Sequence, residues 1–243
     1  TLPRTHVVAD GDGDGDDDIV WLWWDAKAVE FGLSLRPNGG GFFFAPVDTK
    51  VGVIAEIVVA PQSLLVGDID GDGDGDALVF EADKAKGFLR MFGSQQGLFG
   101  AAKFVAAGVK PWVAALGDFD EDGKLDIVAV ERGPSRLVLA LGDGKGAFQS
   151  TGGIDVLAPF KPFTIAVADL DGDKHLDVAM VDDESPELRV FHGDGDAGFT
   201  PPVTIPLDSP AVRVHARALG GAAELDLAVA TFAAGDVSVL IDP

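Results

Sequence analysis

An acidic nine-residue motif occurs four times in this chain of 243 residues, at intervals of about fifty residues. Each copy has the form D-x-D-x-D-x-x-x-D, with aspartate at positions 1, 3, 5 and 9. The copies are Asp10–Asp18, Asp68–Asp76, Asp118–Asp126 and Asp169–Asp177. A fifth, degraded copy at 218–226 keeps only the last aspartate, Asp226. Repetition at such a period restricts the fold to repeat architectures, in which each repeat is one supersecondary unit.

Short apolar segments flank every motif. The segment before it, such as Leu64–Val66, and the run after it, such as Ile127–Val130, are too short for helices and rich in branched residues. A third run, such as Leu137–Leu141, ends in a Gly/Asp turn, and the fourth strand is expected to begin at the phenylalanine after that turn. The sequence therefore predicts an all-β fold, a five-bladed β-propeller of four-stranded antiparallel blades. Its repeats, 1–58, 59–108, 109–159, 160–207 and 208–243, would form one domain.

The last repeat differs from the others. It offers three apolar runs, without the Gly-Phe turn and fourth strand that follow in the other repeats. The last blade is therefore expected either to have three strands or to take its outer strand from a partner chain across an open edge. Pairing of this kind would give a head-to-tail assembly.

The chemistry of the motif points to a cation. Carboxylates at positions 1, 3 and 5 of a glycine-bearing loop face one concave side, and a bend near position 6 brings position 9 round. Four like charges held so close are unfavourable unless a cation neutralises them. An all-oxygen site suits Ca²⁺ better than Mg²⁺ or Zn²⁺, and an EF-hand is excluded because position 12 falls inside an expected strand. Four Ca²⁺ sites are predicted, with the carboxylate ligands Asp10, Asp12, Asp14, Asp18, Asp68, Asp70, Asp72, Asp76, Asp118, Asp120, Asp122, Asp126, Asp169, Asp171, Asp173 and Asp177.

These motifs and the Gly-Phe turns, such as 141–148, resemble the FG-GAP/VCBS repeat family, the calcium-loop blades of integrin α-subunit heads and many bacterial secreted proteins. The resemblance covers essentially the whole chain. It implies that each loop joins the first two strands of a blade and that the residue at position 7 ligates Ca²⁺ through its backbone carbonyl. Those residues are Asp16, Asp74, Lys124 and His175.

Two departures from the family pattern are visible. The family usually has glycine at position 6, so Lys174 implies a strained or weaker fourth site. In the fifth repeat Ala218, Gly220 and Ala222 replace the ligands, so that repeat is expected to bind no metal.

Composition excludes several other functions. The chain has 40 Asp and Glu against 18 Lys and Arg, which gives a formal net charge of −22. This charge repels phosphate, so no nucleic-acid partner is expected.

The absence of cysteine excludes disulfides and thiolate metal sites, and no apolar run is long enough to indicate a membrane span. No catalytic motif is found, so the chain is not expected to be an enzyme. Its four histidines, assigned to loops and surfaces, are His6, His175, His192 and His215.

One aromatic cluster, Trp21–Trp24, has two interpretations. Alternation along a strand puts Trp21 and Trp23 on one face and Trp24 on the other. These rings either fill the core between blades or form a platform for a sugar ring.

The predicted function is that of an extracellular binding module. Weak calcium sites need the high calcium concentration found outside the cell, so the chain is predicted to be secreted or displayed on the cell surface. The expected role is adhesion, carbohydrate recognition or surface structure, with a protein or glycan ligand. The alternatives are a self-assembling filament or surface-layer subunit, joined through the open edge, and a polysaccharide-degrading enzyme.

Overall fold

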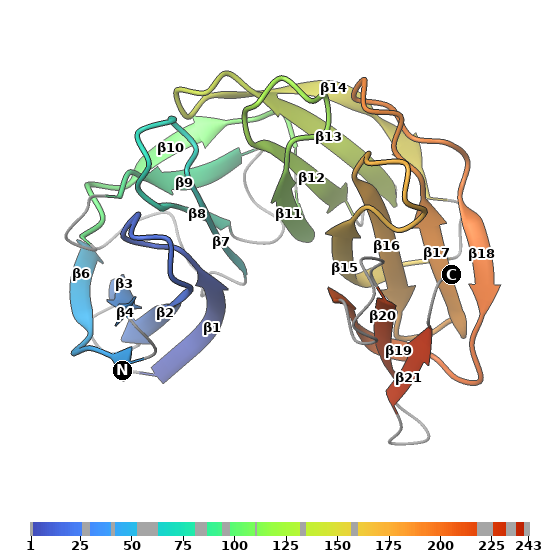
Figure 1. Cartoon of the computed structure of the whole chain (residues 1–243), viewed down its shortest axis with the longest axis horizontal. Coiled ribbons are helices and arrows are strands. Elements are labelled where there is room, and N and C mark those ends of the chain that lie inside the picture. The colour runs from blue at the N-terminus through green and yellow to red at the C-terminus, as the bar shows by residue number, and fades with distance from the viewer. Residues whose placement is uncertain are drawn as a thin grey trace. The chain divides into compact units, whose positions relative to one another are not determined.

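The computed structural model describes residues 2–25, 30–39, 42–52, 63–80, 87–93, 98–109, 111–131, 135–156, 160–217, 226–231 and 237–240. Their regular structure consists of β-strands, arranged as four antiparallel sheets of four strands, one sheet of three strands and one two-stranded ribbon (Figure 1). The four-stranded sheets are the blades of a β-propeller fold. Within this part of the chain, no helix is long and apolar enough to cross a membrane.

The chain divides into two compact units. The first comprises Thr1–Trp112 with Gly142–Ser150, and the second comprises Val113–Leu141 with Thr151–Pro243. The first unit holds the blades of the first two repeats. The second unit holds the three-stranded sheet and the strands of the third and fourth blades, except for residues 142–150.

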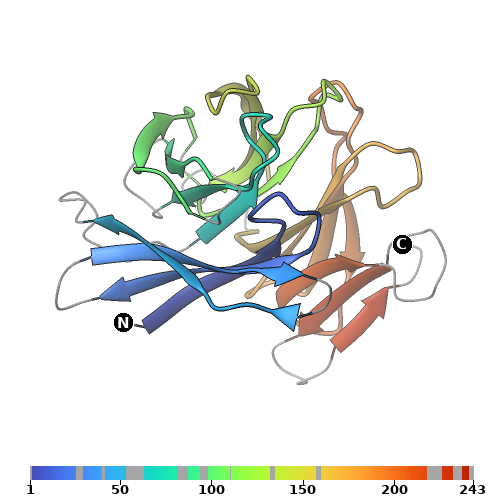
Figure 2. The same ribbon diagram turned by 60° about the vertical axis from the view of Figure 1, so that its left-hand side comes forward.

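Each blade of the first unit is an antiparallel sheet (Figure 2). The first blade has the order β1-β2-β3-β6, from β1 (Leu2–Ala9), β2 (Asp18–Asp25), β3 (Glu30–Arg36) and β6 (Val47–Gly52). A short ribbon, β4 (Asn38–Gly39) with β5 (Phe42–Phe43), is inserted between β3 and β6. The second blade pairs β7 (Ser63–Gly67), β8 (Asp76–Phe80), β9 (Gly87–Met91) and β10 (Lys103–Ala106) in sequence order.

The blades of the second unit follow the same plan. The third blade consists of β11 (Val113–Gly117), β12 (Asp126–Glu131), β13 (Arg136–Gly142) and β14 (Phe148–Asp155). The fourth consists of β15 (Pro162–Ala168), β16 (Asp177–Asp182), β17 (Glu187–Phe191) and β18 (Val203–Pro206). The fifth repeat forms the sheet β19 (Ala211–Arg217), β20 (Asp226–Thr231) and β21 (Val237–Leu240).

The described residues therefore form four full blades and not five, and the fifth repeat forms a sheet of three strands among them, in agreement with the alternative of a last blade without its outer strand. The reason lies in the stretch from 211 to 240, which supplies three apolar runs for three strands.

The prediction that each fourth strand begins at the phenylalanine after the turn is right only in the third blade, at Phe148. In the second blade β10 begins four residues after Phe99, and in the fourth blade Phe199 makes only an isolated bridge to Gly193 before β18. In the first blade Phe42 belongs to the inserted ribbon. In the second and fourth blades the phenylalanine belongs to the turn region, and the outer strand begins several residues later.

Burial explains the continuous apolar runs after the motifs. Strands β8 and β16 are buried at every residue, because their side chains pack on both faces of a blade. In the first unit one core cluster joins the two blades through residues such as Leu22, Phe31 and Val79. First strands of neighbouring blades also contact each other, β1 with β7 in the first unit, and β15 with β11 and β19 in the second. This packing fixes where the motif loops begin and end.

Candidate metal centres

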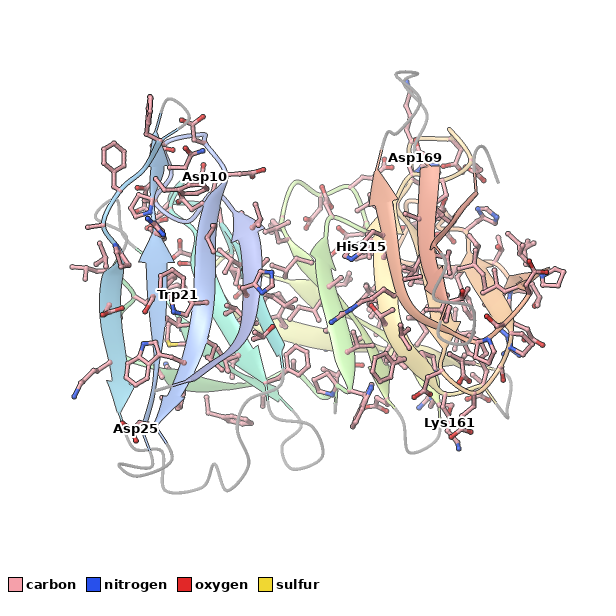
Figure 3. All side chains as sticks on the ribbon, turned by 90° about the horizontal axis from the view of Figure 1, so that it is seen from below. Asp10, Trp21, Asp25, Lys161, Asp169 and His215 are labelled. Atoms are coloured by element: carbon pink, nitrogen blue, oxygen red, sulfur yellow. The ribbon has the colours of Figure 1, made fainter. Side chains whose placement is uncertain are left out.

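Every acidic motif occupies the loop between the first and second strands of its blade. The aspartate at position 9 is the first residue of the second strand in each case, and its side chain is fully buried. Figure 3 shows Asp10 at one end of the first blade and Asp25 at the opposite end; in the second unit, Asp169 and Lys161 lie at opposite ends of β15. The motif loops thus project from one end of each blade.

The buried position-9 carboxylate holds each loop closed. Its Oδ2 accepts a hydrogen bond from the backbone N–H of position 2, with N···O distances of 2.8–3.0 Å for the donors Gly11, Ile69, Phe119 and Leu170. In three loops Oδ1 accepts a second bond from a backbone N–H just beyond the third strand, at 2.7–2.9 Å, from Asn38, Gly93 and Gly193. One carboxylate therefore connects the start of the loop, the second strand and the turn that follows the third strand.

The aspartate at position 1 organises the middle of the loop. Its two oxygens accept hydrogen bonds from backbone N–H groups at positions 4, 5 and 6. The donors, at 2.7–3.1 Å, are Gly13 and Gly15; Gly71, Asp72 and Gly73; Asp122 and Gly123; and Gly172 and Lys174. This bonding curls the chain so that the carboxylates of one loop converge.

The curl requires left-handed backbone at positions 4 and 6. Glycine meets this requirement at six of the eight places, and the exceptions are Glu121, with φ of 58°, and Lys174, with φ of 80°. Lys174 thus adopts a backbone conformation that favours glycine, and the weaker fourth site stays a prediction.

The structure brings together three carboxylates in each loop, with one oxygen from each within 4.8 Å of the others. Positions 1, 3 and 9 converge in the first two loops, and positions 1, 3 and 5 in the last two. The clusters are Asp10, Asp12 and Asp18; Asp68, Asp70 and Asp76; Asp118, Asp120 and Asp122; and Asp169, Asp171 and Asp173. Asp14, Asp72 and Asp126 lie outside these clusters of described residues, and Asp177 belongs to a further cluster with Asp171 and His192.

Two carboxylate oxygens in the first unit are buried without a hydrogen-bond donor in the part of the chain that the structure describes. Asp12 Oδ1 and Asp70 Oδ1 are buried and accept no hydrogen bond from the described residues. A buried acceptor without a donor is costly, and a bound cation would satisfy it. The residues present therefore fit an ion bound by oxygen.

Electrostatics in the first two loops agree with that fit. Burial raises the pKa of Asp76 to about 6, although the N–H groups of Gly93 and Ile69 lower it. Burial also raises the pKa values of Asp12, Asp18 and Asp70, with nearby carboxylates adding to the effect. Charges that are costly to bury alone become favourable once a cation neutralises them.

The third loop already contains a cation of its own. Lys124 Nζ lies 2.5 Å from Asp122 Oδ2, and this hydrogen bond lowers the pKa of Asp122. The lysine side chain is exposed, so it can turn into solvent when an ion binds. The four position-7 residues, Asp16, Asp74, Lys124 and His175, donate their N–H groups to the position-5 aspartate at 2.8–3.0 Å. Ligation through their carbonyls stays a prediction.

Neighbouring loops touch within each unit, by different means. In the first unit the backbones of two loops meet at glycines. A Cβ added at Gly75 would be 2.5 Å from the carbonyl oxygen of Asp10 and 2.7 Å from the Cα of Gly11. In the second unit side chains meet, and His175 Nδ1 lies 2.5 Å from Glu121 Oε1. That contact raises the pKa of His175.

The predicted aromatic cluster lies on the first blade. Val20 and Leu22 are fully buried, and the alternating residues Trp21 and Trp23 are half-buried. Figure 3 shows Trp21 midway along β2. Trp23 lies against the backbone of Gly32 on the paired strand β3. The side chain of Trp24 and the fifth-repeat positions Ala218, Gly220 and Ala222 lie outside the described residues.

Two features were missed from the sequence. His192, after β17, lies beside two motif aspartates. A pocket of about 300 Å³ lies within the second unit, lined by residues of β13, β14 and the turn after β17, among them Leu137, Thr151, Asp194 and Phe199. The sequence feature that could have revealed His192 is its place directly before the Gly-Asp turn. No sequence feature indicates the pocket, because the residues that line it come from two blades.

Comparison with known families identifies part of the chain. A family model described as FG-GAP-like repeat matches residues 118–180. The match begins at the first aspartate of the third loop and ends inside β16, so it spans both loops of the second unit. The chain contains an FG-GAP-like repeat. The predicted resemblance to this family is confirmed, and the first unit carries the same D-x-D-x-D-x-x-x-D motif as the matched FG-GAP-like segment.

Solved structures support the fold. An Agrocybe aegerita lectin that specifically recognises non-reducing terminal N-acetylglucosamine has a TM-score of 0.65 at 21% identity, over 100% of this chain and 67% of the lectin chain. The Photorhabdus luminescens Tc holotoxin pore has a TM-score of 0.51 at 17% identity, over 100% of this chain and 11% of that chain. At such identities the likeness shows the fold alone. No curated protein sequence matches the chain significantly.

Proposed function

We propose that the chain is a calcium-binding β-propeller module that acts outside the cell as a non-catalytic binding protein. The observation that carries this proposal is the recurrence of a cluster of three motif carboxylates, on one hydrogen-bonded scaffold, in four loops. The oxygen atoms of these clusters suit Ca²⁺, which takes six to eight oxygen ligands and tolerates irregular geometry. We assign the fifth repeat to the same propeller, as a fifth blade.

The location follows from the affinity expected of such sites. Exposed loops of this kind bind Ca²⁺ with dissociation constants of about 0.1–1 mM, so each site stabilises the fold by about 1 kcal/mol at millimolar calcium. Four sites then supply a sizeable part of a typical domain stability of about 5–15 kcal/mol. Cytosolic calcium is too low for this, so the proposal places the protein in an extracellular setting.

Chelation tests the calcium proposal. We expect excess EDTA to lower the melting temperature by about 10 °C or more, because the free energy of four bound ions is lost. Calcium added back should restore the melt, and calorimetric titration should count the sites. Asp72→Asn should lower affinity at one site, while Asp155→Asn, outside the loops, serves as the control. An unchanged melting curve in EDTA would refute the proposal.

For the ligand we propose a glycan. The pocket of the second unit combines an aromatic ring, Phe199, with polar groups on Asp194 and Thr151, and sugars are bound by such mixed surfaces. The lectin with a similar fold adds support at the level of analogy. Trp21 and Trp23 offer a second platform on the first blade.

A glycan array, run in calcium and in EDTA, tests this ligand class. Binding should depend on calcium, and Phe199→Ala should reduce it at least about tenfold while Trp21→Ala leaves it unchanged if the pocket is the site. Loss with Trp21→Ala instead would move the site to the first blade. Absence of glycan binding would favour a protein ligand, and shortening of a bound polysaccharide would favour the enzyme alternative.

Self-association is a separate proposal that rests on the fifth repeat. Among the described residues β21 pairs only with β20, and the other repeats each have a further strand. A strand from a second copy could pair with β21. Sedimentation over a range of concentrations tests this, and a monomer at every concentration would contradict it.

A further inference from the structure

His192 gives the fourth blade a ligand that its counterparts lack. It directly precedes Gly193, whose N–H donates to the position-9 aspartate of the fourth loop at 2.9 Å. In the second blade the N–H of Gly93 makes the same bond, so Phe92 holds the place of His192. The sequence places Leu141 there in the third blade, since 141–144 and 192–195 both continue with Gly-Asp-Gly. Phenylalanine and leucine have no atom that binds a cation in this way.

The imidazole of His192 faces the carboxylates of the fourth loop. Its Nδ1 lies 3.2 Å from Asp171 Oδ2 and 3.5 Å from Asp177 Oδ2. These three residues form a cluster of possible metal ligands, with Asp177 fully buried and Nδ1 itself buried. Nδ1 nevertheless makes no hydrogen bond with the described residues, because neither contact has suitable geometry. A buried ring nitrogen near two carboxylate oxygens, without a hydrogen bond to either, is a donor set that a metal ion would satisfy.

We propose that the fourth loop binds a zinc-class divalent ion, in preference to Ca²⁺, through His192, Asp171 and Asp177. Zn²⁺ binds nitrogen and carboxylate ligands at about 2.0–2.2 Å in a tetrahedron, which places neighbouring ligand atoms about 3.4 Å apart. The observed separations of 3.2 and 3.5 Å already match that edge. Imidazole is a poor ligand for Ca²⁺ and a good one for Zn²⁺, Co²⁺ and Ni²⁺.

This inference rests on the proposed function, because it takes the loops as cation sites, but it assigns the fourth loop a different ion. The competing interpretation is that His192, when protonated, acts only as a counter-charge for Asp171 and Asp177. In that case the imidazole would oppose the binding of any cation.

The test compares the wild-type chain with His192→Leu, which installs the residue that the third blade has. Titration with Co²⁺, whose visible spectrum reports nitrogen ligation, and with Zn²⁺ should show one site in the wild type. His192→Leu should weaken both ions at least about tenfold and leave the Ca²⁺ affinity of the other loops unchanged. His215→Leu, an exposed histidine on β19, is the matched control and should bind like the wild type. Equal Zn²⁺ affinity in His192→Leu and wild type would overturn the inference.

A second measurement is independent of any effect on folding. In the wild-type protein the ring ¹⁵N signals of His192, assigned by their loss in the variant, should shift on addition of Zn²⁺ and not of Ca²⁺; unshifted signals would contradict ligation. The two proposals fail separately. Zn²⁺ binding that depends on His192 without any Ca²⁺ binding would leave this inference standing and remove the calcium function. Calcium binding with no Zn²⁺ site would do the reverse.

Discussion

In the second loop, Gly73 and Phe92 stand where the fourth loop has Lys174 and His192. Both loops nevertheless have the same backbone: position 6 is left-handed, and the position-9 carboxylate accepts the same two hydrogen bonds. The comparison teaches that a few shared hydrogen bonds keep the backbone of the loop, while residues outside those bonds differ. Under the proposal above, such a difference changes which ion is bound without changing the fold.

The largest expected effect tests whether the scaffold is shared. Asp76→Ala and Asp177→Ala should each lower the free energy of unfolding by about 3–5 kcal/mol in calcium. Each leaves two buried N–H groups without acceptors, at about 1–3 kcal/mol apiece, and removes a ligand. Denaturant titration measures this, and Asp72→Ala, which removes the acceptor of one N–H group rather than two, should cost less in the chelated protein. A small loss in only one of the two variants would show that the loops are built differently.

A smaller effect concerns pH in EDTA. The pKa of Asp76 is about 6 in the folded protein, and its ordinary value is 3.8. At pH values between these two, the Asp76 carboxyl therefore takes up a proton when the chain folds. The metal-free protein should therefore gain up to about 3 kcal/mol as pH falls from 7 to 4, and lose it as pH rises through 6. Asp76→Asn, neutral throughout, should remove this contribution from the pH dependence of stability.

The fourth loop sharpens this comparison. Burial raises the pKa of Asp177 as well; the N–H groups of Gly193 and Leu170 lower it, as their counterparts do for Asp76, and His192 lowers it further. Asp177→Asn should therefore change the pH dependence less than Asp76→Asn does. Equal changes in the two variants would mean that His192 has no electrostatic effect on its loop.

The smallest effect is a reciprocal exchange at position 6. Gly73→Ala should cost about 1 kcal/mol, because φ there is 92° while an added Cβ meets no atom within 4 Å. Lys174→Gly should relieve the same strain, which stabilises the folded chain by about 0.5–1 kcal/mol. The greater freedom of glycine in the unfolded chain offsets part of this gain. Lys174→Ala controls for the lysine charge. Thermal melts measure all three, and changes of the same sign in both loops would refute the equivalence.

The sequence predicted the blades because two independent patterns mark the strands of each repeat. Apolar runs mark the strands themselves, and the acidic motif marks the loop between the first two. The sequence did not predict the ribbon at Asn38–Phe43, since a Gly-Phe pair there has the same composition as the turns that precede outer strands. The convergence of three aspartates in each loop was predictable from spacing, and their ligation of Ca²⁺ stays a prediction. His192 was not predictable, because it lies outside the motif and reaches the loop only through the register of β16 with β17.

The different roles of the motif positions also bear on which aspartate the fifth repeat keeps. The fifth repeat has lost the aspartates of positions 1, 3 and 5, and it retains Asp226 as the first residue of β20. In the intact copies the equivalent residue is the buried one that ties three segments together. A carboxylate at that position serves the hydrogen-bonded scaffold as well as an ion. An aspartate at position 9 therefore has a use even in a repeat that lacks the other three.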